Sequence, residues 1–206
     1  MRALLAAITV VLGLGSAAHA KPGTFLIAEG EVGFGLGDAF PEGPTGIVGG
    51  VTLGAGGKPR GSPLRFYGVL NLGWASYSGE VDSPIETATI ERDTFAWSAG
   101  LRVISPIVRR LRFFAEATLG GYAVTTEGRL GGGAELVRAD DGSFLVGFAA
   151  GLQWRFNLAF SLGARFDLAV PTSLESFDPI AEAAGAASSA AGFANLGFGL
   201  TATFHL

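Results

Sequence analysis

Apolar and polar residues alternate along most of this chain. The clearest example is segment 195–206, whose even positions are apolar from Leu196 to Leu206 and whose odd positions are small or polar. A period of two places these sets on opposite faces of a β-strand. The segment is about as long as the roughly 9 to 11 residues that a tilted strand needs to cross a bilayer. The alternation predicts eight strands, over 25–37, 47–55, 64–76, 94–104, 110–123, 144–156, 158–170 and 195–206.

The connections between these strands differ in length and charge. Those after the second, fourth and sixth strands are short, whereas those after the third, fifth and seventh are predicted to be long loops, at 77–93, 125–142 and 171–192. The last of these is compatible with a short helix at 180–190. Fourteen of the 18 acidic residues lie in the four connections of the long-loop side, whereas Lys58, Arg60, Arg109 and Arg110 lie at the other end. Short turns on one side and long loops on the other are typical of outer-membrane barrels.

The direction in which the apolar face points distinguishes a soluble barrel from a membrane barrel. A soluble, lipocalin-like barrel would fill its interior with the apolar residues and turn its charges to water. Here the polar face is mostly Gly, Ser and Thr, and only 16% of all residues are charged, against about 25% in soluble domains. The apolar face is therefore predicted to meet lipid. The fold class is all-β, an eight-stranded antiparallel transmembrane up-and-down β-barrel with short periplasmic turns and longer extracellular loops.

The N-terminal segment predicts export. Arg2 precedes an apolar run over 3–15, and Ala18-His19-Ala20 fits a signal-peptidase site, so residues 1–20 are expected to be a cleaved signal peptide. An N-terminal membrane anchor is the alternative, but the apolar run is short for a span. The barrel domain would comprise 21–206. Cysteine is absent, which excludes a disulfide framework and a lipid-attachment cysteine.

Aromatic residues gather toward the two ends of the predicted strands. Trp74 and Trp97 lie toward the outer end and Trp154, Phe156 and Phe204 toward the inner end, as two interfacial girdles would. Phe204, third from the end, and the apolar Leu206 resemble the C-terminal insertion signal of bacterial outer-membrane barrels, with Leu206 in place of the usual Phe.

The whole of 21–206 resembles the small eight-stranded outer-membrane barrels, the OmpA-like and OmpW-like group. The resemblance implies the outer membrane of a Gram-negative-type bacterium, with lipid and lipopolysaccharide around the barrel and the barrel-assembly machinery as a partner during biogenesis. We expect a monomer, and a formal net charge of -4 gives no indication of nucleic-acid binding.

Charged residues on the inward face are the candidate site. Unpaired burial of a charge in a narrow lumen costs several kcal/mol, so these side chains must pair or keep water. Either an ion-pair network fills the barrel, or a charged constriction gates a narrow pore. We predict that Glu29 and Glu116 engage Arg102 and Arg112; the alternative closure is aromatic packing of Tyr67, Phe114 and Tyr122. The predicted inward charges are Glu29, Glu31, Arg65, Arg102, Arg112, Glu116, Arg165 and Asp167.

Catalytic chemistry has little support in the sequence. A hydroxyl nucleophile needs a neighbouring base, and after residue 20 the one histidine is His205, at the inner end of the last strand. No cofactor and no metal is expected. The predicted function is a structural or surface-interaction barrel with a largely plugged lumen; the alternative is a narrow passive porin-like channel for small solutes.

Overall fold

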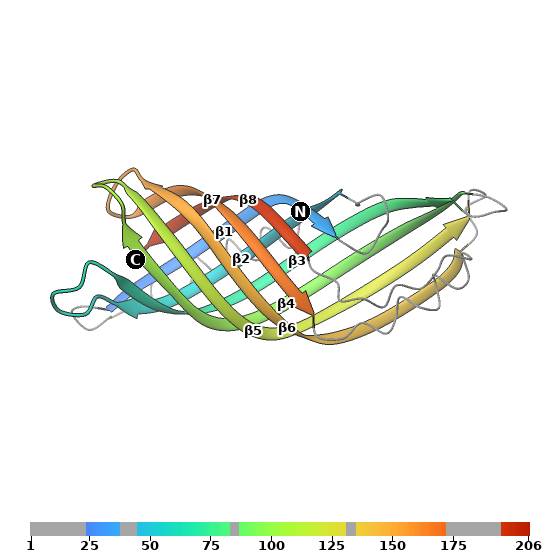
Figure 1. Cartoon of the computed structure of the whole chain (residues 1–206), viewed down its shortest axis with the longest axis horizontal. Coiled ribbons are helices and arrows are strands. Elements are labelled where there is room, and N and C mark those ends of the chain that lie inside the picture. Colours follow the sequence, from blue (N-terminus) through green and yellow to red (C-terminus); the bar gives the residue numbers. More distant parts are fainter. Residues whose placement is uncertain (1–23, 38–44, 83–86, 131–134, 172–194) are drawn as a thin grey trace.

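The computed structural model describes residues 24–37, 45–82, 87–130, 135–171 and 195–206. The expected signal peptide at 1–20 and the possible helix at 180–190 lie outside these residues. The described residues form eight strands in one closed antiparallel barrel, in which each strand pairs with its neighbours in the chain (Figure 1). The strands are β1 (Thr24–Gly37), β2 (Thr45–Gly57), β3 (Arg65–Asp82), β4 (Thr87–Pro106), β5 (Leu111–Leu130), β6 (Glu135–Arg155), β7 (Phe160–Pro171) and β8 (Asn195–His205).

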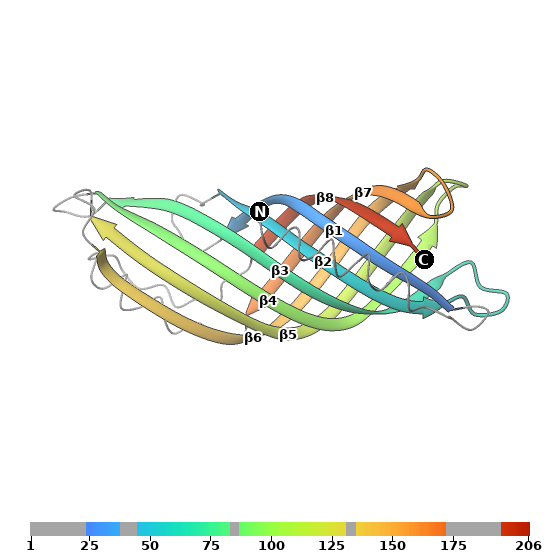
Figure 2. The ribbon, with the colours of Figure 1, turned by 180° about the vertical axis from the view of Figure 1, so that it is seen from behind.

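The barrel closes between the first and last strands. β8 pairs antiparallel with β1 from Ile27↔His205 to Gly37↔Asn195, and the two strands lie side by side in Figure 2. Closure leaves no free strand edge at the heights where all eight strands pair, a requirement for a sheet in hydrocarbon. In the extensions, the edge of β3 beyond Tyr77 and the edge of β6 before Leu145 have no partner strand among the described residues. No helix among the described residues is long and apolar enough to span a membrane.

Large apolar side chains cover the outside of the barrel. Phe34, Leu101 and Leu200 are 70%, 68% and 68% exposed, and many further apolar residues point outward with them. The inward face instead buries charged and polar groups such as Arg102 and Gln153, both 0% exposed. An apolar exterior around a polar interior suits a barrel surrounded by lipid, so the predicted fold class is confirmed.

The five aromatic residues proposed for the girdles point outward, each between 44% and 57% exposed. At the inner end the ring of Phe160 lies 6.0 Å from that of Phe156 and 5.3 Å from that of Phe204, between centroids. Phe204 pairs with Phe160, the first residue of β7. Trp74 and Trp97 lie near the middle of β3 and β4, because both strands extend well beyond the ends predicted for them.

The predicted ends of four strands were wrong. β3 to β6 continue well past the other strands, so most of 77–93 and 125–142, predicted as loops, is strand (Figure 1). Asp140, Asp141 and Gly142, at the end of the second of these predicted loops, lie within β6. These extensions carry charges on both faces, for example Glu91 and Arg92. Where a strand leaves the lipid it no longer needs an apolar face, so the alternation that marks a membrane strand is lost.

Candidate functional site in the barrel lumen

Arg102 is the centre of a buried ion-pair cluster. Its Nη1 and Nη2 donate to the two carboxylate oxygens of Glu29 at 3.0 and 2.9 Å, and its Nε donates to Glu116 at 2.6 Å. The side chain is fully buried. Arg102 and Glu116 are paired positions of β4 and β5, whereas Glu29 comes from β1 on another side of the lumen. The planar guanidinium thus bridges two carboxylates across the barrel.

Arg165 of β7 extends the cluster toward the outer end. Its nitrogens lie 3.3 Å from Glu29, 3.3 Å from Glu116, 3.2 Å from Glu31 and 2.7 Å from Asp167. The side chain is 6% exposed. Two arginines therefore hold four carboxylates from β1, β5 and β7 in one layer.

Uncharged side chains satisfy the remaining acceptors. Gln153 Nε2 and Thr203 Oγ1 both donate to Glu29 Oε2, at 2.8 and 2.7 Å, and Asn71 Nδ2 donates to Glu116 Oε1 at 2.6 Å. Gln153, Thr203 and Asn71 were not among the site residues predicted from the sequence. Their inward positions were visible in the alternation, but single amides and hydroxyls carry no pattern of their own.

An apolar layer lies against the cluster on its inner side. Ile27, Tyr67, Val69, Ile104 and Phe114 form one cluster in which no residue is more than 3% exposed. The Arg102 guanidinium stacks over the Phe114 ring, 4.7 Å from its centroid, which is a favourable cation–π distance. The ion pairs and the aromatic packing, posed as alternatives from the sequence, form two adjacent layers. Tyr122 packs elsewhere, with Val124 and Leu145.

Two of the predicted lumen charges lie outside the cluster. Arg112 makes no ion pair within the described part of the chain, so its predicted contact with Glu29 and Glu116 was wrong. Arg112 stands four residues from Glu116 on β5, roughly 13 Å along the strand, and Arg165 occupies the place expected for it. Arg65 stacks on the ring of Phe25 instead of meeting an acid. The sequence predicted four acids balanced by four bases, whereas the cluster in the structure contains four acids and two arginines.

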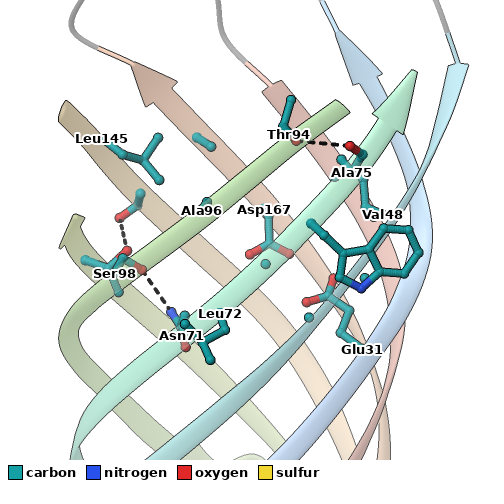
Figure 3. A pocket seen from close by; sticks show the side chains of 18 of the residues that line it. Glu31, Val48, Asn71, Leu72, Ala75, Thr94, Ala96, Ser98, Leu145 and Asp167 are labelled. Carbon is teal, nitrogen blue, oxygen red and sulfur yellow. Dashed lines mark hydrogen bonds between the residues drawn. The ribbon is translucent and has the colours of Figure 1, made fainter. Parts of the chain in front are cut away.

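A cavity of about 170 Å³ lies on the outer side of the cluster. The carboxylates of Glu31 and Asp167 point into it (Figure 3), while Asn71 and Ser98 line its wall. Small inward residues such as Gly50, Gly73 and Gly147 leave this space open. The cavity thus adjoins the buried charges of the cluster on their outer side.

Comparisons with known proteins show the fold and no close relative. No protein-family model and no curated protein matches the chain. Among solved structures, Neisserial surface protein A (NspA) matches with a TM-score of 0.50 at 11% identity, over 88% of this chain and 96% of that one. Ail, the attachment invasion locus protein of Yersinia pestis, matches at 0.47 and 12% identity over 90% and 100%. The N-terminal barrel domain of Pseudomonas aeruginosa OprF matches at 0.40 and 17% over 87% and 97%.

This chain has the fold of the small eight-stranded outer-membrane β-barrels. With its apolar exterior, that fold places the protein in an outer membrane.

One contact in this outer-membrane barrel bears on catalysis. His205 Nε2 lies 2.8 Å from the hydroxyl of Ser161, the geometry of a nucleophile and its base. The two residues are 44 positions apart, so no local pattern in the sequence pairs them. Ser161 is 0% exposed, and His205 Nδ1 has no hydrogen-bond partner among the described residues. A buried hydroxyl whose histidine lacks an orienting acid is poorly arranged for attack on a substrate.

Proposed function

We propose that this barrel is a non-conducting outer-membrane protein with a structural or surface-interaction role. The observation that carries the proposal is the fully buried Arg102, which joins β1, β4 and β5 through Glu29 and Glu116. An eight-stranded barrel is just wide enough for side chains to fill it. A solute would have to separate buried ion pairs and displace the apolar layer around Phe114, so the resting lumen is closed.

The extended strands support the surface part of the proposal. β3 to β6 reach beyond the rest of the barrel (Figure 1). Their outer parts expose charged residues such as Glu91 and Asp93, and Arg138 lies 3.3 Å from Glu127 and 3.9 Å from Asp140. Charged outward faces belong in water, so these hairpins would stand above the lipid, where a partner reaches them. Lipopolysaccharide around the barrel and a monomeric state belong to the same proposal.

A narrow solute channel is the second candidate, supported by the cavity beside Glu31 and Asp167. Single-channel recording in planar bilayers separates the two. The closed barrel should show no conductance steps, and Arg102→Ala combined with Arg165→Ala should introduce them. Arg110→Ala, in the exposed β4–β5 turn, is the matched control. Steady conductance of the unaltered protein would overturn the closed-lumen proposal in favour of the channel.

The proposal also states that the protein is not an enzyme. The buried Ser161 and its unoriented histidine support this part. Refolded protein should hydrolyse neither ester nor phospholipid substrates. Hydrolysis that disappears in both Ser161→Ala and His205→Ala, while the two variants stay folded, would contradict it.

A further inference from the structure

The three inner turns of the barrel and the strand ends beside them carry basic residues and no acidic side chain. No Asp or Glu occurs in 53–68, 103–115 or 150–164, the stretches that form the three inner turns and the strand ends beside them. The same stretches hold seven basic residues, Lys58, Arg60, Arg65, Arg109, Arg110, Arg112 and Arg155. Four of them lie on exposed turns, while Arg65, Arg112 and Arg155 are half-buried on strands.

These three arginines converge on the inner mouth of the lumen. Arg112 is within electrostatic range of Arg65 and Arg155, and Arg155 is within range of Arg65. None of the three makes an ion pair in the described ranges. Arginine does not lose its proton in proteins, so the repulsion among them cannot be relieved by neutralisation.

Contacts with uncharged groups hold the cluster in place. Arg65 stacks on the Phe25 ring at 4.7 Å, and Arg155 donates from Nε and Nη2 to the backbone carbonyls of Asn157 and Leu158 at 2.8 and 2.5 Å. Such anchoring keeps like charges together before any ligand arrives. Preorganisation of this kind lowers the entropic cost of binding.

Two donors in this region have no acceptor. The Tyr67 hydroxyl has no hydrogen-bond partner although the residue is only 1% exposed, and it lies within electrostatic range of Arg112 and Arg155. Arg112 Nη1 is also buried without a partner. Buried donors are nearly always satisfied in folded proteins, so both groups are available to an acceptor from outside the chain.

We propose that Arg65, Arg112, Arg155 and the Tyr67 hydroxyl form a binding site for a phosphate-class oxyanion at the inner mouth of the barrel. A tetrahedral oxyanion offers several acceptor oxygens, which match the planar forks of the arginines and the single donor of the tyrosine. A chloride ion offers no such directional match. The anion would also compensate the three positive charges.

The site lies on the inner side of the carboxylate cluster. On β5 the buried Phe114 lies between Arg112 of the site and Glu116 of the carboxylate cluster. The chemistry fits both free phosphate and the phosphodiester of a lipid headgroup at the inner leaflet. Binding here does not depend on whether the lumen conducts, so this proposal and the closed-lumen proposal fail independently.

The test uses the full chain refolded in uncharged octyl glucoside with nitrogen-15 arginine. Inorganic phosphate is titrated at constant ionic strength against chloride, and the side-chain Nε–H resonances are followed. The resonances of Arg65 and Arg112 should shift saturably. Arg112→Gln should weaken binding by about tenfold or more. Arg112→Lys, which keeps the charge and loses the fork, and Tyr67→Phe should weaken it less. Arg110→Gln, on the exposed turn, should not change it.

Vesicles distinguish the two sources of phosphate. The same resonances are compared in phosphatidylglycerol vesicles and in uncharged glycolipid vesicles, without free phosphate. Saturable shifts with inorganic phosphate assign the site to a free anion, and shifts confined to phosphatidylglycerol assign it to a headgroup. Heat-modifiable gel migration confirms that each variant is folded. The proposal would be overturned if saturable shifts appeared neither with inorganic phosphate nor with phosphatidylglycerol, or if chloride produced equal shifts. Equal effects of Arg110→Gln and Arg112→Gln on binding would also overturn it.

Discussion

Arg102 and Glu116 occupy paired positions on β4 and β5, and the Nε of Arg102 donates to the carboxylate of Glu116 at 2.6 Å. The other edge of the same guanidinium binds both oxygens of Glu29. One side chain therefore connects a neighbouring strand to a distant one. The stability of the barrel should depend on this residue more than on any surface charge.

Replacing Arg102 by methionine should lower the free energy of unfolding by about 3 to 5 kcal/mol, because two buried carboxylates lose their main partner. Arg110→Met, on the exposed inner turn, should change it by less than about 0.5 kcal/mol. Urea unfolding in lipid vesicles, followed by tryptophan fluorescence, measures both. Equal effects of the two substitutions would show that the buried cluster does not stabilise the barrel.

Two acids of the cluster should respond differently to loss of charge. Glu116 accepts hydrogen bonds from Arg102, Arg165 and Asn71, so Glu116→Gln should cost about 1 to 3 kcal/mol. Among the described residues Glu31 makes an ion pair with Arg165 alone and lies beside the like-charged Asp167, and its side chain is 15% exposed. Because acids outnumber arginines in the cluster, Glu31→Gln should cost less than about 0.5 kcal/mol or stabilise. A lower denaturant midpoint for Glu31→Gln than for Glu116→Gln would contradict the interpretation that acids outnumber arginines in the cluster.

Gly151 supports the apolar layer by leaving room for Phe114. A Cβ at this position would collide with the carbonyl oxygen of Ala164 and lie 2.5 Å from Phe114 Cε1. Gly151→Ala should therefore destabilise the barrel by about 1 to 3 kcal/mol through overpacking. Gly30→Ala is the control, since a Cβ there meets nothing within 4 Å. Thermal unfolding of both variants in the same detergent measures the difference, and equal melting temperatures would contradict the prediction.

The aromatic contacts at the inner end should contribute to stability beyond simple burial. Phe204 packs on Phe160, which also contacts Phe156. Phe204→Ala should cost about 0.5 to 1.5 kcal/mol more than Leu200→Ala, an outward residue of the same strand. Unfolding in vesicles measures the difference. If Phe204→Ala and Leu200→Ala lowered the free energy of unfolding equally, the ring contacts would make no specific contribution to stability.

The alternation predicted the membrane-spanning part of each strand but not the strand extensions. In β8 and β7 the predicted and observed ends differ by at most two residues. In β4 the prediction began at Thr94, whereas the strand begins at Thr87. Lipid imposes an apolar face only along the buried height of a strand, so the polar outer parts of β3 to β6 carry no such signal.

The sequence by itself determined the number of strands, the antiparallel order, which face meets lipid and which charged residues point inward, because each of these depends on local alternation within one strand. The tertiary structure alone decided which charges meet. Glu29 and Arg102 are 73 positions apart, and their contact depends on how far all the strands are staggered when the barrel closes. The same stagger placed Arg165 in the cluster and left Arg65, Arg112 and Arg155 together at the inner mouth.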